Sequence, residues 1–201
     1  MAGFEDPAEA RFIERLAARD ERAFNELVQL YGERIFRLVH RMLGRREEAE
    51  DMAQEVFVQV FKAIDQFRGD SKLGTWIYRI AVNTCKNRSK YLSRRYSDRE
   101  EEFEPLAERS AVGEAAGASS EYAQPDQVVA GYQVEGIVRK CIAELDEDFR
   151  EVLILRDLED LSYEDIVTIT GHPEGTVKSR LHRARAMLKA KVEALLGEKI
   201  P

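Results

Sequence analysis

The sequence predicts an all-α protein in which two small helical domains are joined by a flexible acidic linker, the C-terminal one being a helix-turn-helix. Apolar residues recur at helical spacing through most of the 201 residues. The stretch 98–135 departs from that spacing and carries ten acids against two cations. Charge is also segregated within the net −7: residues 72–95 hold seven cations and no acid, and residues 174–191 hold six cations and one acid. Residues 139–165, between them, carry ten acids and four cations, so two separate segments are suited to a polyanion.

The N-terminal part is expected to form four helices. The first covers 8–18, and the second follows Asp20, a good N-cap, and ends at Gly44, which can adopt the left-handed conformation. A third helix is predicted over 46–67, where apolar side chains share one side. The segment RGDSKLG then interrupts the pattern with two glycines and a serine, and a fourth helix follows over 76–94.

The middle of the chain has the composition of a tether. Residues 97–125 are rich in Gly, Ala, Ser and acids and poor in aliphatic side chains. Such a segment buries too little apolar surface to offset the entropy of ordering, which predicts a mobile linker. We therefore divide the chain into an N-terminal domain at 1–97, a linker at 98–130 and a C-terminal domain at 131–201. Helical spacing resumes near Asp126 and continues in four pieces.

The C-terminal domain contains the most specific pattern, LSYEDIVTITGHPEGTVKSRLHRARAMLK. Ser162 and Asp165 form a capping box at the start of a short helix. Gly171 suits a tight turn, and Pro173 suits the start of the next helix. That helix has one apolar face and is basic on its other faces. A short helix, a tight turn and a basic amphipathic helix predict a helix-turn-helix that enters the major groove of DNA.

The fourth helix of the N-terminal domain also has two unlike faces. Its cations and amides share one side at helical spacing, and its apolar residues share another. The polar side consists of Arg79, Asn83, Lys86, Asn87, Lys90 and Arg94. Cations attract phosphates, Asn can bond base edges, and Trp76 and Tyr91 can stack on unpaired bases, so this face suits opening or single-stranded DNA. A solvated basic face beside a buried Trp76 is the alternative interpretation.

Several classes of protein are excluded or disfavoured. The N-terminus has acids where a secretory signal needs cations, and no apolar run approaches ~18 residues, so we expect a cytoplasmic protein that is not membrane-inserted. Cys85 and Cys141 form no CxxC pair, and His40, His172 and His182 lie far apart, so neither a disulfide nor a metal site is expected. With no Gly-rich phosphate loop and no nucleophile–base pair, we expect no catalytic residue, cofactor or small-molecule substrate.

Three segments, in this order, resemble bacterial RNA polymerase sigma factors of the extracytoplasmic-function group, especially the sigma-E type. AEDMAQEVFVQVFKAIDQF is similar to the family's main docking helix for polymerase. FRGDSKLGTWIYRIAVNTCKN is similar to the segment that melts and reads the −10 promoter element. LSYEDIVTITGHPEGTVKSRLHRAR is similar to the helix-turn-helix that reads the −35 element. The chain departs from the sigma-E pattern at 72–74 and at His182, which bears on the preferred promoter bases.

The resemblance implies roles for particular side chains. In the −10 segment the loop 68–74, with Asn83, would hold a flipped base and Trp76 would support the edge of the bubble. The implied −10 contacts are Arg68, Asp70, Ser71, Lys72, Trp76, Arg79, Asn83, Lys86, Asn87 and Lys90. The implied −35 contacts are Thr176, Lys178, Ser179, Arg180, His182 and Arg183, with Arg180 contacting phosphate only. The implied contacts with core polymerase are Asp51, Gln54, Glu55 and Gln59.

The resemblance implies a sigma factor that binds core RNA polymerase, through its clamp coiled coil and flap, and directs promoter recognition, melting and initiation. It further implies a stress or envelope regulon under the control of an anti-sigma factor. Two other classes stay open on the residues alone. A transcription regulator would explain 136–201 but not the acid-free segment 72–95, and it would bind its operator without polymerase. A pure protein-interaction module would not explain two separate basic faces.

Overall fold

The computed structural model describes residues 7–100 and 125–197, with side chains described at 7–95 and 134–197. All the regular elements among these residues are helices, which confirms the all-α prediction. In the N-terminal part they are α1 (Pro7–Ala17), α2 (Glu21–Leu43), α3 (Arg46–Ala63), the 3₁₀ turn η1 (Ile64–Gln66) and α4 (Leu73–Glu100). In the C-terminal part they are α5 (Pro125–Ala143), α6 (Glu147–Leu153), the π-helical turn η2 (Ile154–Leu158), α7 (Tyr163–Thr170) and α8 (Glu174–Leu196).

The ends of α2 lie where the sequence predicts them. The carboxylate of Asp20 accepts a hydrogen bond from the backbone N–H of Arg22 at 2.8 Å, as an N-cap does. Gly44 ends the helix with φ 81°, and its N–H donates to the carbonyl of His40. An N-cap hydrogen bond of this kind stabilises a helix by about 1 kcal/mol. Residues close in sequence therefore set both ends of α2.

The loop that precedes α4 is shorter than expected, because α4 begins at Leu73 and not after Gly74. The side chain of Leu73 is fully buried, and its backbone N–H donates to Glu9 Oε1 at 3.2 Å. Glu9 lies in α1, so a residue distant in sequence satisfies one of the free N–H groups at the start of α4. The third helix likewise ends at Ala63, and η1 follows it, instead of continuing to Phe67.

The helix-turn-helix forms as predicted. Ser162 Oγ accepts from the backbone N–H of Asp165 at 3.1 Å and caps α7. Gly171 ends α7 in the left-handed conformation, with φ 71°. Pro173 stands at the N-cap of α8, so the second helix begins one residue later, at Glu174.

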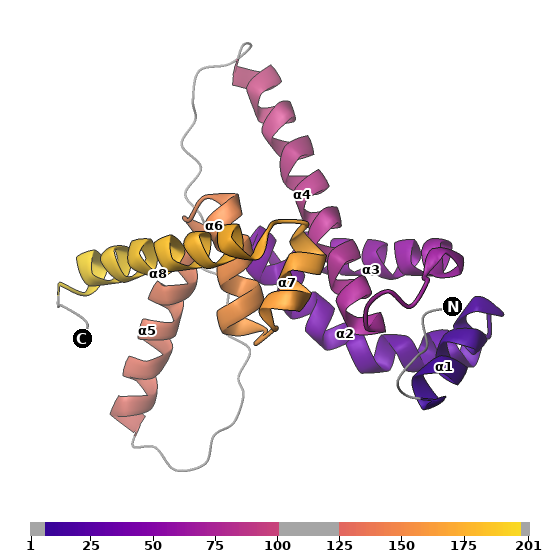
Figure 1. Ribbon diagram of the computed structural model, residues 1–201. Coiled ribbons are helices and arrows are strands. Elements are labelled where there is room, and N and C mark those ends of the chain that lie inside the picture. Colours follow the sequence, from indigo (N-terminus) through magenta and orange to yellow (C-terminus); the bar gives the residue numbers. More distant parts are fainter. Residues whose placement is uncertain (1–6, 101–124, 198–201) are drawn as a thin grey trace.

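The two halves of the chain pack against each other. Figure 1 shows α7 beside the first turns of α4, while the far end of α4 projects away from the other helices. Buried apolar residues of both halves form one continuous cluster. The expected linker at 98–130 falls mainly on 101–124, outside the described residues, and its ends continue α4 and open α5. Among the helices that the structure describes, none combines the length and apolarity needed to cross a membrane.

Candidate nucleic-acid interface

The basic side of α4 is largely open to solvent. Arg79, Asn83, Asn87 and Lys90 are exposed, while Ile77 and Ala81 on the opposite side are fully buried. We call Arg79, Asn83, Lys86, Asn87 and Lys90 the α4 basic face. The apolar side anchors the helix in the core, so the cations and amides stand on a rigid support, as phosphate and base contacts require.

Lys86 differs from the rest of the α4 basic face. Its side chain is only 21 % exposed, and its Nζ lies 2.8 Å from Glu151 Oε1 of α6. Glu151 is fully buried, and neither of its carboxylate oxygens has a hydrogen bond of good geometry among the described residues. Burial raises the pKa of Glu151, although Lys86 acts in the opposite direction. The Lys86–Glu151 pair therefore joins the two halves of the chain. The sequence alone predicts that Lys86 contacts a phosphate instead.

The loop before α4 exposes Arg68, Asp70 and Lys72, with Ser71 half-buried. Trp76, at the start of α4, is half-buried and packs at a tilt on Phe67, with 5.3 Å between the ring centroids. The loop thus adjoins an indole that is held by ring packing, and Asp70, Ser71 and Lys72 line a cleft against the C-terminal half. This arrangement leaves polar groups of the loop accessible to a ligand while the helix end stays fixed.

Gly74 permits a close approach between α4 and α2. A Cβ built on Gly74 would lie 3.3 Å from Cε1 and from the hydroxyl oxygen of Tyr31, tighter than most real contacts. The glycine that the sequence reading placed in the loop therefore serves helix packing. Tyr31 also lines a cleft of about 1020 Å³ between the loop and the C-terminal half.

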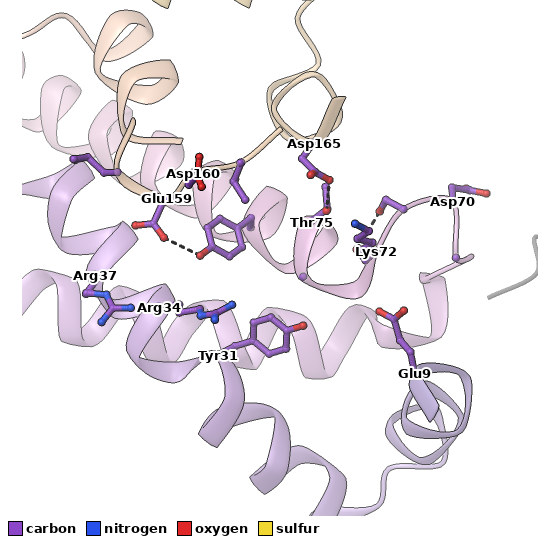
Figure 2. Close-up of a pocket in the computed structure, with 16 residues that line it drawn as sticks. Glu9, Tyr31, Arg34, Arg37, Asp70, Lys72, Thr75, Glu159, Asp160 and Asp165 are labelled. Atoms are coloured by element: carbon purple, nitrogen blue, oxygen red, sulfur yellow. Dashed lines mark hydrogen bonds between the residues drawn. The ribbon is translucent and has the colours of Figure 1, made fainter. Parts of the chain in front are cut away.

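Figure 2 shows this cleft, with Glu159, Asp160 and Asp165 on one side and Tyr31, Arg34 and Arg37 on the other. Two hydrogen bonds cross from α4 to the C-terminal half at its edge. Thr75 Oγ1 donates to Asp165 Oδ1 at 2.7 Å, and the Tyr78 hydroxyl donates to Glu159 Oε2 at 2.9 Å.

The second helix of the helix-turn-helix, α8, turns Val177, Leu181 and Ala184 into the core. Its remaining sides present the residues predicted to contact the −35 element. Exposed among these are Lys178, Ser179, His182 and Arg183, and half-buried are Thr176 and Arg180. The buried positions of Val177, Leu181 and Ala184 fix which residues of α8 point outward. A recognition helix that enters the major groove needs such a fixed orientation.

Two of these cations already have partners within their own domain. Lys178 pairs with Glu174 one turn earlier and lies over the ring of Tyr163, 5.2 Å from its centroid. Arg180 is 23 % exposed and reaches Asp148 of α6 at 2.7 Å. The Lys178 pair is an exposed contact that DNA can displace at little cost. The Arg180 pair is more enclosed, so Arg180 also joins α8 to α6.

The predicted polymerase contacts lie along α3. Asp51 and Gln54 are exposed, and Glu55 and Gln59 are half-buried. Gln59 Nε2 donates to Glu55 Oε1 at 3.2 Å, and Gln59 Oε1 accepts from Thr84 Oγ1 at 3.1 Å. The exposed carboxylate of Asp51 is accessible to a basic partner, whereas Gln59 also ties α3 to α4.

The fold brings His172 to the carboxylates of Asp148 and Glu151, with candidate ligand atoms within 4.8 Å of one another. No sequence spacing indicates this cluster. The positive charge that a divalent ion would supply is already present, because Lys86 and Arg180 reach the two carboxylates at 2.8 and 2.7 Å. The cluster is therefore better described as a charge network between α4, α6 and the helix-turn-helix.

Sequence reasoning from helix faces did not find the residues that join the two halves, namely Arg41, Thr75, Tyr78, Arg150, Glu151 and Glu159. One signal was present in the sequence. Glu151 is an acid immediately before the run VLIL, all of which is buried. A charged residue beside such a run needs a partner, but its position in the sequence does not identify that partner.

Family models match two parts of the chain. The model described as Sigma-70 region 2 matches residues 27–104, and the model described as Sigma-70, region 4 matches residues 135–188. The first match includes α3, the loop and α4, and the second includes the helix-turn-helix. The α4 basic face therefore lies within the first matched region, and the exposed side of α8 lies within the second.

Curated relatives match over nearly the whole chain. The RNA polymerase sigma-H factor of Pseudomonas aeruginosa is 39 % identical over 188 residues, covering 94 % of this chain and 95 % of the relative. The ECF RNA polymerase sigma-E factor of Escherichia coli is 38 % identical over 188 residues, covering 92 % of this chain and 94 % of the relative.

Two solved structures share the fold. CnrH in complex with the cytosolic domain of CnrY matches with a TM-score of 0.64 at 20 % identity, covering 94 % of this chain and 99 % of the other. The sigma factor RpoE in complex with the anti-sigma factor NepR, from Bartonella quintana, matches with a TM-score of 0.64 at 24 % identity, covering 85 % and 96 %.

Proposed function

We propose a function from the premise that the chain belongs to the sigma-70 family of RNA polymerase sigma factors and to its extracytoplasmic-function group. The chain binds core RNA polymerase and directs promoter recognition, melting and initiation. It acts in the cytoplasm, where polymerase and promoter DNA are. The observation that carries this proposal is the pairing of the region 2 match with the α4 basic face and of the region 4 match with α8.

The N-terminal domain, at 1–97, would bind polymerase and open the −10 element. The exposed cations of the α4 basic face would hold phosphates of the non-template strand, and the loop would hold an unstacked base. Unstacking a base costs a few kcal/mol, and a stacking contact of about 1–3 kcal/mol with an aromatic ring such as Trp76 would offset part of that cost. The packing of Trp76 on Phe67 supports this role, because it fixes the indole in advance.

The C-terminal domain, at 131–201, would read the −35 element with α8 in the major groove. Lys178, Ser179, His182 and Arg183 are the exposed candidates for contacts with bases or the neighbouring backbone. Thr176 stands at the N-terminal end of α8, the end that approaches bases in helix-turn-helix proteins. Arg180 is the candidate phosphate contact, and it would have to exchange Asp148 for the phosphate.

Polymerase would dock on α3. Asp51, Gln54 and Glu55 form an acidic and polar strip that suits a basic coiled coil, with Gln59 at its edge. The linker at 98–130 would connect the two DNA-reading domains on polymerase. Opposite charges across the interface between α3 and a basic coiled coil would chiefly raise the association rate and select the partner.

An anti-sigma factor is a proposed further partner. CnrH and the Bartonella RpoE, which share this fold, are seen with CnrY and with the anti-sigma factor NepR respectively. A partner of this kind would have to cover surfaces that polymerase or DNA would otherwise use. Isolation of the chain from its own cells with a bound protein that blocks polymerase binding would support this partner.

Run-off transcription with purified core polymerase tests the proposed function. The chain plus core polymerase should give defined transcripts from a subset of promoter fragments of its own genome, and core polymerase alone should not. A DNA-binding regulator that is not a sigma factor is the competing class. It would bind a duplex tightly at physiological salt without polymerase and give no new start sites, and that pair of results would overturn the proposal.

A further inference from the structure

The loop before α4 is the part of the proposed −10 surface that lies outside the helices. Residues 67–72 connect η1 to α4 and belong to neither a helix nor a strand. Gly69 within the loop has φ 75°, a left-handed conformation that glycine adopts without steric cost. A binding site on such a loop is less accurately placed than one on a helix, unless other residues hold the ends of the loop.

The end of the loop that leads into α4 is held by Glu9 of α1. The carbonyl of Lys72 accepts from the N–H of Trp76 at 3.1 Å, which makes Lys72 the residue before the first turn of α4. A lysine side chain has no acceptor and cannot cap a helix. The N–H of Leu73 donates instead to Glu9 Oε1 at 3.2 Å. The negative charge of Glu9 also suits the positive end of the helix dipole.

The end of the loop segment that follows α3 is held by Arg19, in the turn after α1. The guanidinium of Arg19 donates to the backbone carbonyl of Phe61, in the last turn of α3, and pairs with Asp65 of η1. It also lies over the Phe61 ring, with 4.6 Å between the guanidinium carbon and the ring centroid. The last carbonyls of a helix lack intrahelical partners, and a cation near them is favourable. Arg19 therefore stabilises the point at which α3 gives way to η1.

The backbone of Arg19 is unusual for a residue with a side chain. Its φ is 61°, in the left-handed region. The N–H of Arg19 donates to the carbonyl of Leu16 at 3.0 Å, and that of Asp20 to the carbonyl of Arg15 at 3.0 Å, as at a helix end that glycine usually forms. The backbone alone therefore favours glycine at this position. The contacts of the guanidinium offset the strain in the folded chain.

Both residues belong to one firmly packed element. Ile13 and Leu16 of α1 are buried in the core that α1 shares with α2, and Glu9 is half-buried. Figure 2 shows Glu9 projecting from α1 toward the segment that carries Lys72. We call Glu9 and Arg19 the loop anchors. Because the loop anchors lie on α1 and on the turn directly after it, they hold the two ends of 61–73 at a set separation.

We propose that Glu9 and Arg19 are positioning residues for base recognition: they hold the loop and Trp76 in the geometry that accepts one unstacked base of the −10 element. This inference rests on the proposed function of the loop in holding that base. The loop anchors contact no DNA themselves, and both precede residue 27, where the region 2 match begins. They add α1 to the parts of the chain that determine promoter preference.

The loop anchors affect base preference more than general attraction for DNA. The exposed cations of the α4 basic face hold phosphates, and phosphate contacts carry no sequence information. A base contact depends on donors and acceptors placed to within about 0.5 Å. A loop with a loose end therefore still binds DNA but distinguishes bases less well. A simple loss of stability would lower the use of every promoter sequence alike.

The fluorescence of Trp76 tests the first step in the free, full-length chain. Trp76 is the one tryptophan of the sequence, and it packs on Phe67 with 5.3 Å between the ring centroids. We expect Glu9→Leu to increase quenching of this fluorescence by acrylamide, because the start of α4 loses its acceptor. Glu9→Gln keeps an oxygen acceptor and should keep the wild-type value. Glu14→Leu, at an exposed acid of the same helix, is the matched control.

Arg19→Gly separates positioning from stability. Glycine suits the left-handed backbone, while the contacts with Phe61 and Asp65 are lost. If Arg19 only contributes to stability, base preference should stay at the wild-type value in this variant. The proposal requires base preference to fall even so. Urea denaturation establishes the stability of each variant before the promoters are compared.

Base preference is measured with core polymerase and a promoter fragment that the wild-type chain transcribes, prepared with each base in turn at every −10 position. We expect Glu9→Leu and Arg19→Gly to lower the transcript ratio between the preferred base and the others at one position by about three- to tenfold, the range that one hydrogen bond supplies. Core affinity and −35 preference should not change. Glu9→Gln and Glu14→Leu should keep the wild-type ratio.

An unchanged ratio in Glu9→Leu and Arg19→Gly, or an equal loss of transcription from every version of the promoter, would overturn the inference. The same result would leave the proposed sigma function intact, since the wild-type chain would still direct transcription. Absence of promoter-specific transcripts with the wild-type chain would instead count against the proposed function, whatever the quenching of Trp76 shows.

Discussion

The Thr84 hydroxyl of α4 shares its one hydrogen between Gln59 Oε1 of α3 at 3.1 Å and the backbone carbonyl of Ile80 at 2.9 Å, and the first contact joins the proposed −10 helix to the proposed polymerase-docking helix. Thr84 is buried, and Gln59 in turn donates to Glu55 at 3.2 Å. A side chain proposed to contact polymerase is thus in direct contact with the helix proposed to hold the melted strand. Docking on α3 and the position of α4 are therefore mechanically connected.

Replacement of Thr84 by Val should loosen this connection while keeping the side-chain shape. We expect a loss of about 1 kcal/mol in the free energy of unfolding, because a buried hydrogen bond is removed and Gln59 loses a donor. Core affinity should change little and promoter opening should fall more, measured by permanganate reactivity of the −10 thymines. Equal losses in core affinity and in opening would argue against a specific role of the bond.

The polymerase contact predicts a defect in a double charge reversal. Asp51→Arg with Glu55→Arg should weaken binding to core polymerase by about tenfold or more, because two acids facing a basic coiled coil become cations. Helicity by circular dichroism should be retained. Glu14→Arg with Glu33→Arg, at two exposed acids of α1 and α2, is the control with the same change in net charge. Equal core affinity for both double variants would remove α3 as the docking surface.

The −35 contact predicts a base-specific effect at Lys178. Lys178→Ala should cost about 1–3 kcal/mol of promoter binding by the polymerase complex and relax the preference at one base position. Lys189→Ala is the control, since Lys189 is exposed on the same helix but lies outside the predicted contacts. If Lys178→Ala leaves both affinity and base preference unchanged, the orientation assigned to α8 is wrong.

Arg180 and Arg183 should differ in what their loss does to the free protein. Arg180 is largely enclosed and pairs with Asp148, whereas Arg183 is exposed. Arg180→Ala should lower the free energy of unfolding by about 1 kcal/mol, and Arg183→Ala should leave it within the range of ordinary surface changes. Urea denaturation of both variants checks this. Equal stabilities would show that the Asp148 pair contributes nothing measurable to the fold.

The environment of His172 predicts a pH dependence of stability. Burial lowers the pKa of His172 below its ordinary value, and Arg180 and Lys86 act in the same direction while Asp148 opposes them. A depressed pKa in the folded state means that the unfolded chain takes up the proton more readily. The stabilising contribution is therefore complete above the unfolded pKa of about 6.5 and is lost progressively as the pH falls from there through the lower pKa of the folded state.

Chemical denaturation at a series of pH values from neutral to mildly acidic tests this effect. His172→Gln should reduce the loss of stability on acidification relative to wild type. His182→Gln, at an exposed residue of α8, should keep the wild-type profile. A wild-type profile in His172→Gln would show that other groups carry the pH dependence.

Local patterns alone determined most of the secondary structure. Asp20 and Gly44 bound α2, and Ser162 and Gly171 bound α7, because capping groups bond backbone atoms only a few residues away. The two-sided patterns of α4 and α8 were readable for the same reason, since a helix of known period fixes which residues share a side. The sequence motifs in those helices were also sufficient to identify the family, which the comparisons confirm.

Contacts between residues far apart in the sequence were decided only by the tertiary structure. The start of α4 at Leu73 depends on Glu9 of α1, which no pattern near Leu73 reveals. Likewise Lys86 reads as a phosphate ligand from its helix face, and only the packing of α6 on α4 shows that Glu151 holds it. The physical reason is that the local sequence shows which charged side chain or helix-terminal N–H requires a partner. Which residue becomes that partner depends on how the whole fold packs.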